Sequence, residues 1–234
     1  MDITNEPLTA GAAQLILATI PHVRLQNYLV RAPERPEHSA RLYLWNSYMA
    51  AVVQRSTGLV EVQLRNAIDM GLRRWNTMHG GRPEWIVNPV GPLTAVVRPA
   101  AGRPLRSYAE TSSVSGDPTH DDLVAGLSFG SWVRLLPRPG ATSGNPRTVL
   151  WNEALKSALG AGTEPVTAYG SRLRRLVKVR NRAAHHRPLL EVRLLNDAHR
   201  DCVEVLRQLN GPLARWFRAE KWIPKAIAEM PTTR

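Results

Sequence analysis

Apolar residues recur at helical spacing along most of the chain. Residues 8–20 and 22–31 form two short apolar segments separated by Pro21. From about residue 37 the apolar positions lie three and four residues apart, and a second run with this spacing follows Ser56-Thr57-Gly58. Thr57 stands where an N-cap would begin a new helix. The pattern therefore predicts two short helices and then two longer ones, with a break at Thr57.

The middle of the chain has a different amino-acid composition. Residues around 79–120 are rich in proline, glycine and serine, which favours a loop-rich insertion with a short helix or hairpin near 93–97. Helical spacing returns in "LVAGLSFGSWVRLL" (123–136), predicted as one helix that Pro137 stops. Further helices are predicted over 148–159, over 167–186 and from Pro188 to about 210. No strand pattern lasts, so we expect an all-α bundle forming a single domain over residues 1–234. The amphipathic tail from Arg215 would either close the bundle or join a dimer.

Net charge sets this chain apart from an average globular domain. It holds 31 Lys+Arg against 19 Asp+Glu, a formal net charge of +12 at pH 7. Nearly all cations are arginines, since the only lysines are Lys156, Lys178, Lys221 and Lys225. A guanidinium matches phosphate oxygens in pairs, which suits a nucleic-acid partner. A GC-rich genome would equally explain the preference for arginine over lysine, but it does not explain the net charge.

Composition also excludes several classes of protein. The only cysteine, Cys202, cannot form an intrachain disulfide or a cysteine-based zinc framework, so we expect it to fill core on a helix. The chain begins with acidic Asp2 and Glu6 rather than a basic leader, and no run of about 18 apolar residues offers a membrane span. We therefore expect a cytoplasmic protein without a membrane contact.

The segment "VRNRAAHHRP" (179–188) concentrates positive and titratable side chains where a helix ends. At about 100° per residue, Leu173, Leu176 and Val177 define the buried side of this helix, and Arg180 falls in the middle of it. An unpaired buried guanidinium is costly, so Arg180 needs a carboxylate, a phosphate or a hydrated groove. Pro188 disfavours a regular last turn, and a kinked one would bring His185 or His186 beside Arg180.

Two other interpretations of this segment stay open on periodicity alone. Arginine and histidine near a helix C-terminus often complement the dipole and bind free carbonyl groups, without any ligand. A zinc site is the weaker alternative, because the adjacent His185 and His186 point to different sides of a helix and no further ligand motif supports them.

Three segments in the same order resemble the HEPN superfamily, and more narrowly its Abi-like branch, which is linked to bacterial abortive infection. That superfamily's signature is an arginine, a polar residue after it and a histidine shortly downstream, here Arg180, Asn181 and His185. "LYLWNSYMAAVVQRSTGLVEVQLRNAI" (42–68) resembles the branch's first helices, and "LSFGSWVRLL" (127–136) its Phe-Gly-x-Trp helix. The matches span roughly residues 24–190. The branch carries glutamate after the paired histidines, whereas this chain has Arg187, which either adds to RNA binding or marks a lost pairing.

The resemblance implies a HEPN-type helical bundle that cleaves RNA without a metal or other cofactor, as a toxin or phage-defence effector. Its implied partners are RNA, a second copy that places two motifs at one interface, and an antitoxin or phage-encoded regulator. Without a metal, the nucleophile is the RNA 2′-hydroxyl. His185 would act as acid and base, Arg180 as phosphate clamp and Asn181 as polar positioner, with His186 as a second proton carrier or a substrate-orienting group.

Other residues join the candidate site through the same resemblance. Glu61 and Arg65 share a helix face and would ordinarily form an exposed ion pair. The resemblance instead suggests that their helix packs beside the motif, with Glu61 against Arg180 and with Arg65 and Asn66 near the cleft. A basic edge is either a solvated face or a track for the RNA backbone: Arg174, Arg175, Lys178, Arg182 and Arg187. Trp85, in the insertion, is a candidate for stacking on a base.

Two rival functions belong to other classes. A non-catalytic HEPN module would bind RNA or a protein partner, with salt-sensitive RNA affinity and no cyclic-phosphate product. A DNA-binding regulator is disfavoured, because the sequence has no helix-turn-helix pattern.

Overall fold

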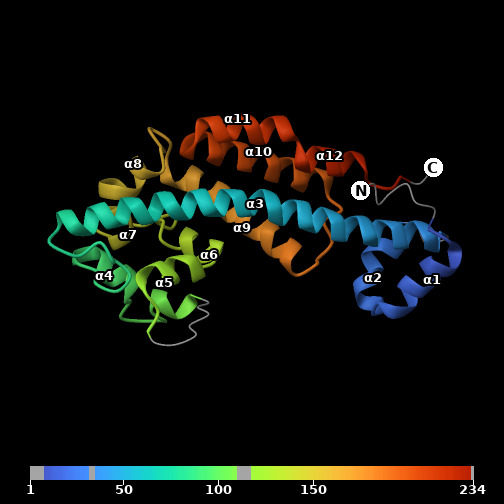
Figure 1. Cartoon of the computed structure of the whole chain (residues 1–234), viewed down its shortest axis with the longest axis horizontal. Coiled ribbons are helices and arrows are strands. Elements are labelled where there is room, and N and C mark those ends of the chain that lie inside the picture. The colour runs from blue at the N-terminus through green and yellow to red at the C-terminus, as the bar shows by residue number, and fades with distance from the viewer. Residues whose placement is uncertain (1–7, 32–34, 110–116, 233–234) are drawn as a thin grey trace.

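One helix, α3 (Pro36–Met78), runs the length of the molecule, and most of the other helices pack against it. It is 43 residues long, which corresponds to about 65 Å at an α-helical rise. In the computed structural model, which describes residues 8–31, 35–109 and 117–232, α3 contacts the two helices that precede it and most of the helices that follow residue 128 (Figure 1). Its buried stripe includes Leu42, Met49, Val60 and Leu72, so the same apolar periodicity continues through the whole helix.

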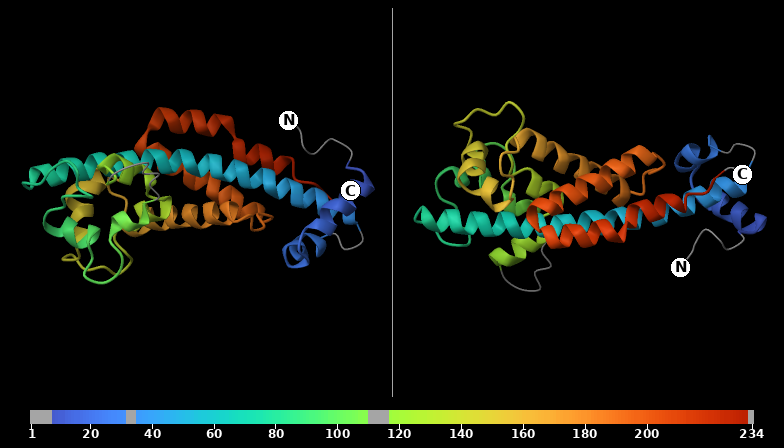
Figure 2. Two further views of the ribbon diagram at one scale, coloured as in Figure 1. Left: turned by 60° about the horizontal axis from the view of Figure 1, so that its bottom comes forward. Right: turned by 90° about the horizontal axis from the view of Figure 1, so that it is seen from above.

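Three groups of helices pack around α3. The short helices α1 (Ala10–Thr19) and α2 (His22–Leu29) cover its N-terminal end. α9 (Val166–Ala184) lies along one side, and α10 (Val192–Leu209) along another. The two views in Figure 2 separate these two helices and show the α1–α2 pair set apart at one end. This arrangement leaves the end of α9 in the region that faces α2.

The predicted break at Thr57 is wrong. Helix α3 continues through it, and the hydroxyls of Ser56 and Thr57 donate to the carbonyl oxygens of Val52 and Val53, each at 2.8 Å. Such bonds to the preceding turn satisfy a buried hydroxyl inside a helix, so neither residue needs to serve as a cap. Both are fully buried, and tertiary packing outweighs the local capping preference.

The other predicted helices form with adjusted bounds. The segment predicted as one helix over 123–136 is two, α5 (His120–Gly126) and α6 (Phe129–Val133). Each has its own cap: Thr119 forms a capping box with Asp122, and the Ser128 hydroxyl accepts from the backbone N–H of Ser131. The predicted helix over 148–159 comprises α7 (Pro146–Leu150), the π-helical turn η2 (Trp151–Leu155) and α8 (Lys156–Ala158).

The loop-rich insertion is anchored to α3 by a buried polar cluster. It contains α4 (Gly91–Val97) and the 3-10 turn η1 (Leu105–Tyr108). The Trp85 indole N–H donates to Asp69 Oδ1 at 2.8 Å, and His120 Nε2 lies 3.0 Å from the same oxygen. Because the Trp85 side chain is fully buried, the expectation that it stacks on a base is wrong.

The chain's last segment packs on the same bundle. α11 (Gly211–Glu220) lies on α10, and α12 (Trp222–Ala228) packs against both α10 and α3. The Trp45 indole N–H donates to the Ala226 carbonyl at 2.8 Å, so the tail closes the bundle within one chain. Cys202 is buried on α10, as expected. Over the described ranges the fold is all-α, with one isolated bridge between Ala109 and Leu127 and no helix that could traverse a bilayer.

Candidate functional site

Helix α9 buries a face that is rotated slightly from the predicted one. Leu173, Leu176, Val179 and Ala183 are fully buried, whereas Val177 is only partly buried. Arg180 therefore lies at the edge of the apolar face and is half-buried. A guanidinium in this position reaches both the neighbouring helices and solvent, which is the environment that a phosphate-binding arginine needs.

Glu61 of α3 meets Arg180 and α6 at one place. Burial raises the pKa of the Glu61 carboxyl, and this is opposed by the positive charge of Arg180, by a hydrogen bond from the backbone N–H of Phe129 and by the charge of Arg65. The guanidinium of Arg65 also donates to the Ala125 carbonyl at 3.5 Å. Glu61 thus links the three segments whose motifs were identified in the sequence, while Asn66 on the same helix is exposed.

Asn181 is positioned to hold the Arg180 side chain. It is exposed, and its Oδ1 accepts a hydrogen bond from Arg180 Nη1 at 3.3 Å. Arg180 thus has one hydrogen-bond acceptor, the Asn181 amide, and it interacts with the Glu61 carboxylate only through charge, since the described residues show no ion pair between the two. The Asn181 amide would orient the guanidinium before any ligand binds.

Helix α9 ends in a Schellman turn built around His186. The N–H of His186 donates to the Ala183 carbonyl at 3.0 Å, and that of Arg187 to the Arg182 carbonyl at 2.8 Å. This turn needs a left-handed residue, normally glycine, and His186 takes that position with φ of 49°. A side chain in this region is strained, and such strain concentrates at functional sites. His185 and His186 are both exposed at this turn.

The chain after the turn is held firmly in place. Arg182 Nη2 donates to the Pro188 carbonyl at 2.5 Å. The next residue, Leu189, donates its backbone N–H to Asn46 Oδ1 at 2.6 Å, in the buried interior against α3. The histidines therefore sit on a loop whose two ends are both fixed to the bundle.

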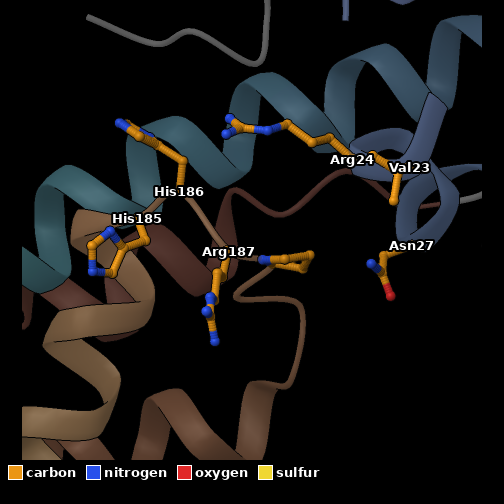
Figure 3. A pocket seen from close by; sticks show the side chains of 7 residues that line it. Val23, Arg24, Asn27, His185, His186 and Arg187 are labelled. Atoms are coloured by element: carbon orange, nitrogen blue, oxygen red, sulfur yellow. The ribbon is translucent and has the colours of Figure 1, made fainter. Parts of the chain in front are cut away.

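A pocket of about 430 Å³ opens beside the two histidines. His185, His186, Arg187 and Pro188 line one side, and Val23, Arg24 and Asn27 of α2 line the other. Figure 3 shows the Arg24 side chain extending from α2 toward the histidine turn, with Arg187 pointing away from it. None of these lining residues is acidic, so the pocket carries positive charge and suits an anionic ligand.

Some residues of the predicted basic edge already have partners within the protein, and others are accessible to solvent. Arg175 forms a two-bonded pair with Asp201 of α10, with both N···O distances 2.8 Å, and Arg182 holds Pro188. Arg174 donates to the Ser171 hydroxyl at 3.2 Å and is half-buried. Lys178 and Arg187 are exposed. Arg175 and Arg182 thus have structural partners that explain their presence without RNA.

The structure groups the predicted site residues into two neighbouring clusters. Arg180, Asn181, Glu61 and Arg65 gather where α9 meets α3 and α6, and His185 with His186 lines the pocket. Arg180 precedes His185 on the same helix, but it is not among the described residues that line the pocket. Figure 3 accordingly shows the histidines with the α2 residues.

Sequence reasoning missed two contributors to this region. Arg24 of α2 is far from the motif in the chain, and no local pattern links the two segments. Asn46 could have been found, because it is a lone amide on the apolar stripe of Leu42, Trp45 and Met49 and therefore needs a buried partner.

The strained backbone of His186 leads to a testable prediction. Replacing it with glycine relieves the left-handed strain, so we expect the free energy of unfolding to rise by about 0.5–1 kcal/mol. Lys221, between α11 and α12, is also left-handed, with φ of 53°, and lies outside the site. Lys221→Gly is therefore the matched control, with a similar gain. Urea unfolding measures both gains. An equal or lower stability of His186→Gly would show that the histidine side chain stabilises its own turn.

Comparison with known proteins adds no relative. Protein-family models, curated protein sequences and solved structures were each compared with this chain, and none matches it. Within the described ranges, no group of three or more histidine, cysteine or acidic side chains is arranged to hold a metal ion.

Proposed function

We propose that this protein is a metal-independent endoribonuclease of the HEPN, Abi-like type. The observation that carries the proposal is the pair of exposed histidines on the rim of a positively charged pocket, at the end of the helix that bears Arg180. The pocket supplies attraction for phosphate, the histidines supply imidazole groups that can accept and donate protons, and Arg180 supplies a fixed positive charge.

The chemistry requires only groups that RNA and this chain provide. The imidazole of His185 accepts the proton of a ribose 2′-hydroxyl, and the 2′-oxygen attacks the adjacent phosphorus. The bond from phosphorus to the 5′-oxygen breaks, and this oxygen takes a proton from an imidazolium, either His185 or His186. Arg180 stabilises the charge that builds on the phosphorane oxygens. The products are a 2′,3′-cyclic phosphate and a 5′-hydroxyl end, and no water is consumed.

Several finer features belong to the same proposal. The helices would form a HEPN-type bundle, and a second copy would bring a second motif to a shared cleft. The protein would act in the cytoplasm as a toxin or phage-defence effector. Uncontrolled RNA cleavage harms the host, so an antitoxin or a phage-encoded protein would regulate it.

Cleavage of a short synthetic RNA in the presence of EDTA tests the proposal. We expect the chain to cut RNA, to leave cyclic-phosphate and 5′-hydroxyl ends, and to leave the matching DNA intact because DNA lacks the 2′-hydroxyl. End-labelling before and after phosphatase treatment identifies the ends. Cleavage that requires a divalent metal, or that leaves 5′-phosphate ends, would rule out this mechanism.

A non-catalytic HEPN module that binds RNA or a protein is the second candidate. It is favoured by the position of Arg180, whose guanidinium interacts with Asn181 and Glu61 rather than lining the pocket. Arg187, in place of the glutamate typical of the Abi-like branch, also fits a site used for binding. This candidate predicts RNA affinity that falls steeply with salt and no cleavage products.

A further inference from the structure

Helix α2 forms the wall of the pocket that faces the histidine turn. Arg24 and Asn27 are on one side of this helix, with Val23 beside them. All three are exposed, so their side chains contribute little to the core. The buried Leu25 and Tyr28 fix the other side of α2 in the bundle. The exposed side is therefore presented to the pocket by a helix whose position is set independently.

The charges in the pocket are not neutralised within it. In the described part of the chain, neither Arg24 nor Arg187 forms an ion pair, whereas Arg31, just beyond α2, lies 3.7 Å from Glu191. The guanidinium groups of Arg24 and Arg187 line a pocket without a carboxylate and therefore repel each other. Such an arrangement costs stability unless an anion is bound, and a guanidinium pairs especially well with phosphate.

We propose that α2 provides a nucleotide-binding subsite next to the scissile linkage, an inference that rests on the proposed function. Arg24 binds the neighbouring phosphate of the RNA from the side opposite Arg187. Asn27 offers amide donor and acceptor groups to the base edge, and Val23 provides an apolar surface for the base or ribose. Arg24 is thus a positioning residue, which holds the strand while the histidines act on the adjacent linkage.

The dimensions of the pocket fit this role. A volume of about 430 Å³ lies at the lower end of the range for small-ligand sites, about 300–1,000 Å³. One nucleotide therefore fits between α2 and the turn. The Arg24 side chain extends toward the turn in Figure 3, so a phosphate between them would contact both walls.

Binding of a fluorescent RNA that cannot be cleaved tests the subsite separately from catalysis. An oligonucleotide with 2′-fluoro groups lacks the nucleophile but keeps every phosphate. We expect Arg24→Ala to weaken binding about tenfold, since losing one paired phosphate contact removes about 1.4 kcal/mol. The slope of log affinity against log salt should fall by about 0.7, as for one phosphate contact on a single strand. Fluorescence anisotropy across a salt series measures both.

Arg215→Ala on α11 is the matched control, because Arg215 is exposed and outside the pocket. It removes the same charge from the molecule, and we expect its affinity to stay within twofold of the wild type. Equal weakening by both variants, or no weakening by Arg24→Ala, would overturn the subsite. If binding depends on Arg24 but unmodified RNA is not cut, Arg24 still binds RNA, while the nuclease proposal and the placement of the subsite beside a scissile linkage fail. If RNA is cut and Arg24→Ala binds normally, only the subsite fails.

Discussion

Replacing His185 with alanine is expected to lower the rate of RNA cleavage by about 10²–10⁴, the usual contribution of a general acid or base. His185 is exposed at the end of α9, so the variant should fold as the wild type does. RNA affinity should change little, because Arg24, Arg187 and Arg180 remain. A single-turnover assay with excess protein separates the chemical step from binding and detects this loss directly.

Three companion variants, two at Arg180 and one at His79, make the result specific. Arg180→Ala removes the charge that stabilises the phosphorane and should lower the rate by about 10²–10³, while Arg180→Lys restores part of it. His79→Ala is the control, since His79 is also exposed but stacks on Trp75 at the opposite end of α3. Wild-type cleavage by His185→Ala would end its catalytic role. Equal losses in the His185 and His79 variants would point to a general effect on the protein.

The sequence predicted most helices because apolar spacing reports directly on burial. The failures occurred where tertiary contacts overrode a local signal. Thr57 looks like an N-cap, but inside the bundle its hydroxyl turns back to the preceding turn of α3. The segment after Asp121 looks like one helix, but Ser128 begins a second one, and this break is what brings the Phe129 N–H to Glu61.

The candidate site could be predicted only as far as it is local. Arg180 and Asn181 lie on α9 and His185 caps it, so their position at one helix end follows from the chain itself, whereas their division into two clusters does not. The role of His186 in the Schellman turn depends on its backbone conformation, which no sequence pattern specified. The opposite wall of the pocket comes from α2, and Arg24 faces the histidine turn across the pocket only when both segments are packed in the bundle. Two segments that are far apart in the chain but close in space produce no periodic pattern in a single sequence.

A network far from the pocket joins α3 to the insertion and to the start of α5. Asp69 of α3 accepts hydrogen bonds from Trp85 and Arg73 and pairs with His120 at the start of α5. Burial alone would raise the pKa of Asp69, but hydrogen bonds from His120, Trp85 and Arg73 outweigh it and lower the pKa. Since α5 leads directly into α6, the position of Phe129 beside Glu61 depends on this anchor.

Replacing Asp69 with alanine is therefore expected to destabilise the protein by about 3 kcal/mol, because it leaves buried partners unpaired. The Trp85 N–H and the His120 ring, both almost fully buried, would lose their acceptor. Against a typical total of about 5–15 kcal/mol this is a large fraction. Urea unfolding at pH 7 measures the loss. Asp197→Asn, which removes a carboxylate from an exposed pair with Arg200, is the control and should change stability by less than about 0.5 kcal/mol.

The destabilisation expected for Asp69→Ala depends on pH in a defined direction. Because the Asp69 pKa is lower in the folded chain than in the unfolded chain, the unfolded chain binds more protons between the two values. The stability that Asp69 provides is thus complete above the ordinary carboxyl pKa, about 4, and is lost as pH falls through the lowered folded value. Wild type and Asp69→Ala should converge in stability as the pH drops below about 4. A constant difference down to pH 2 would mean that Asp69 acts by packing rather than by charge, and the network would then not be the electrostatic anchor of α5.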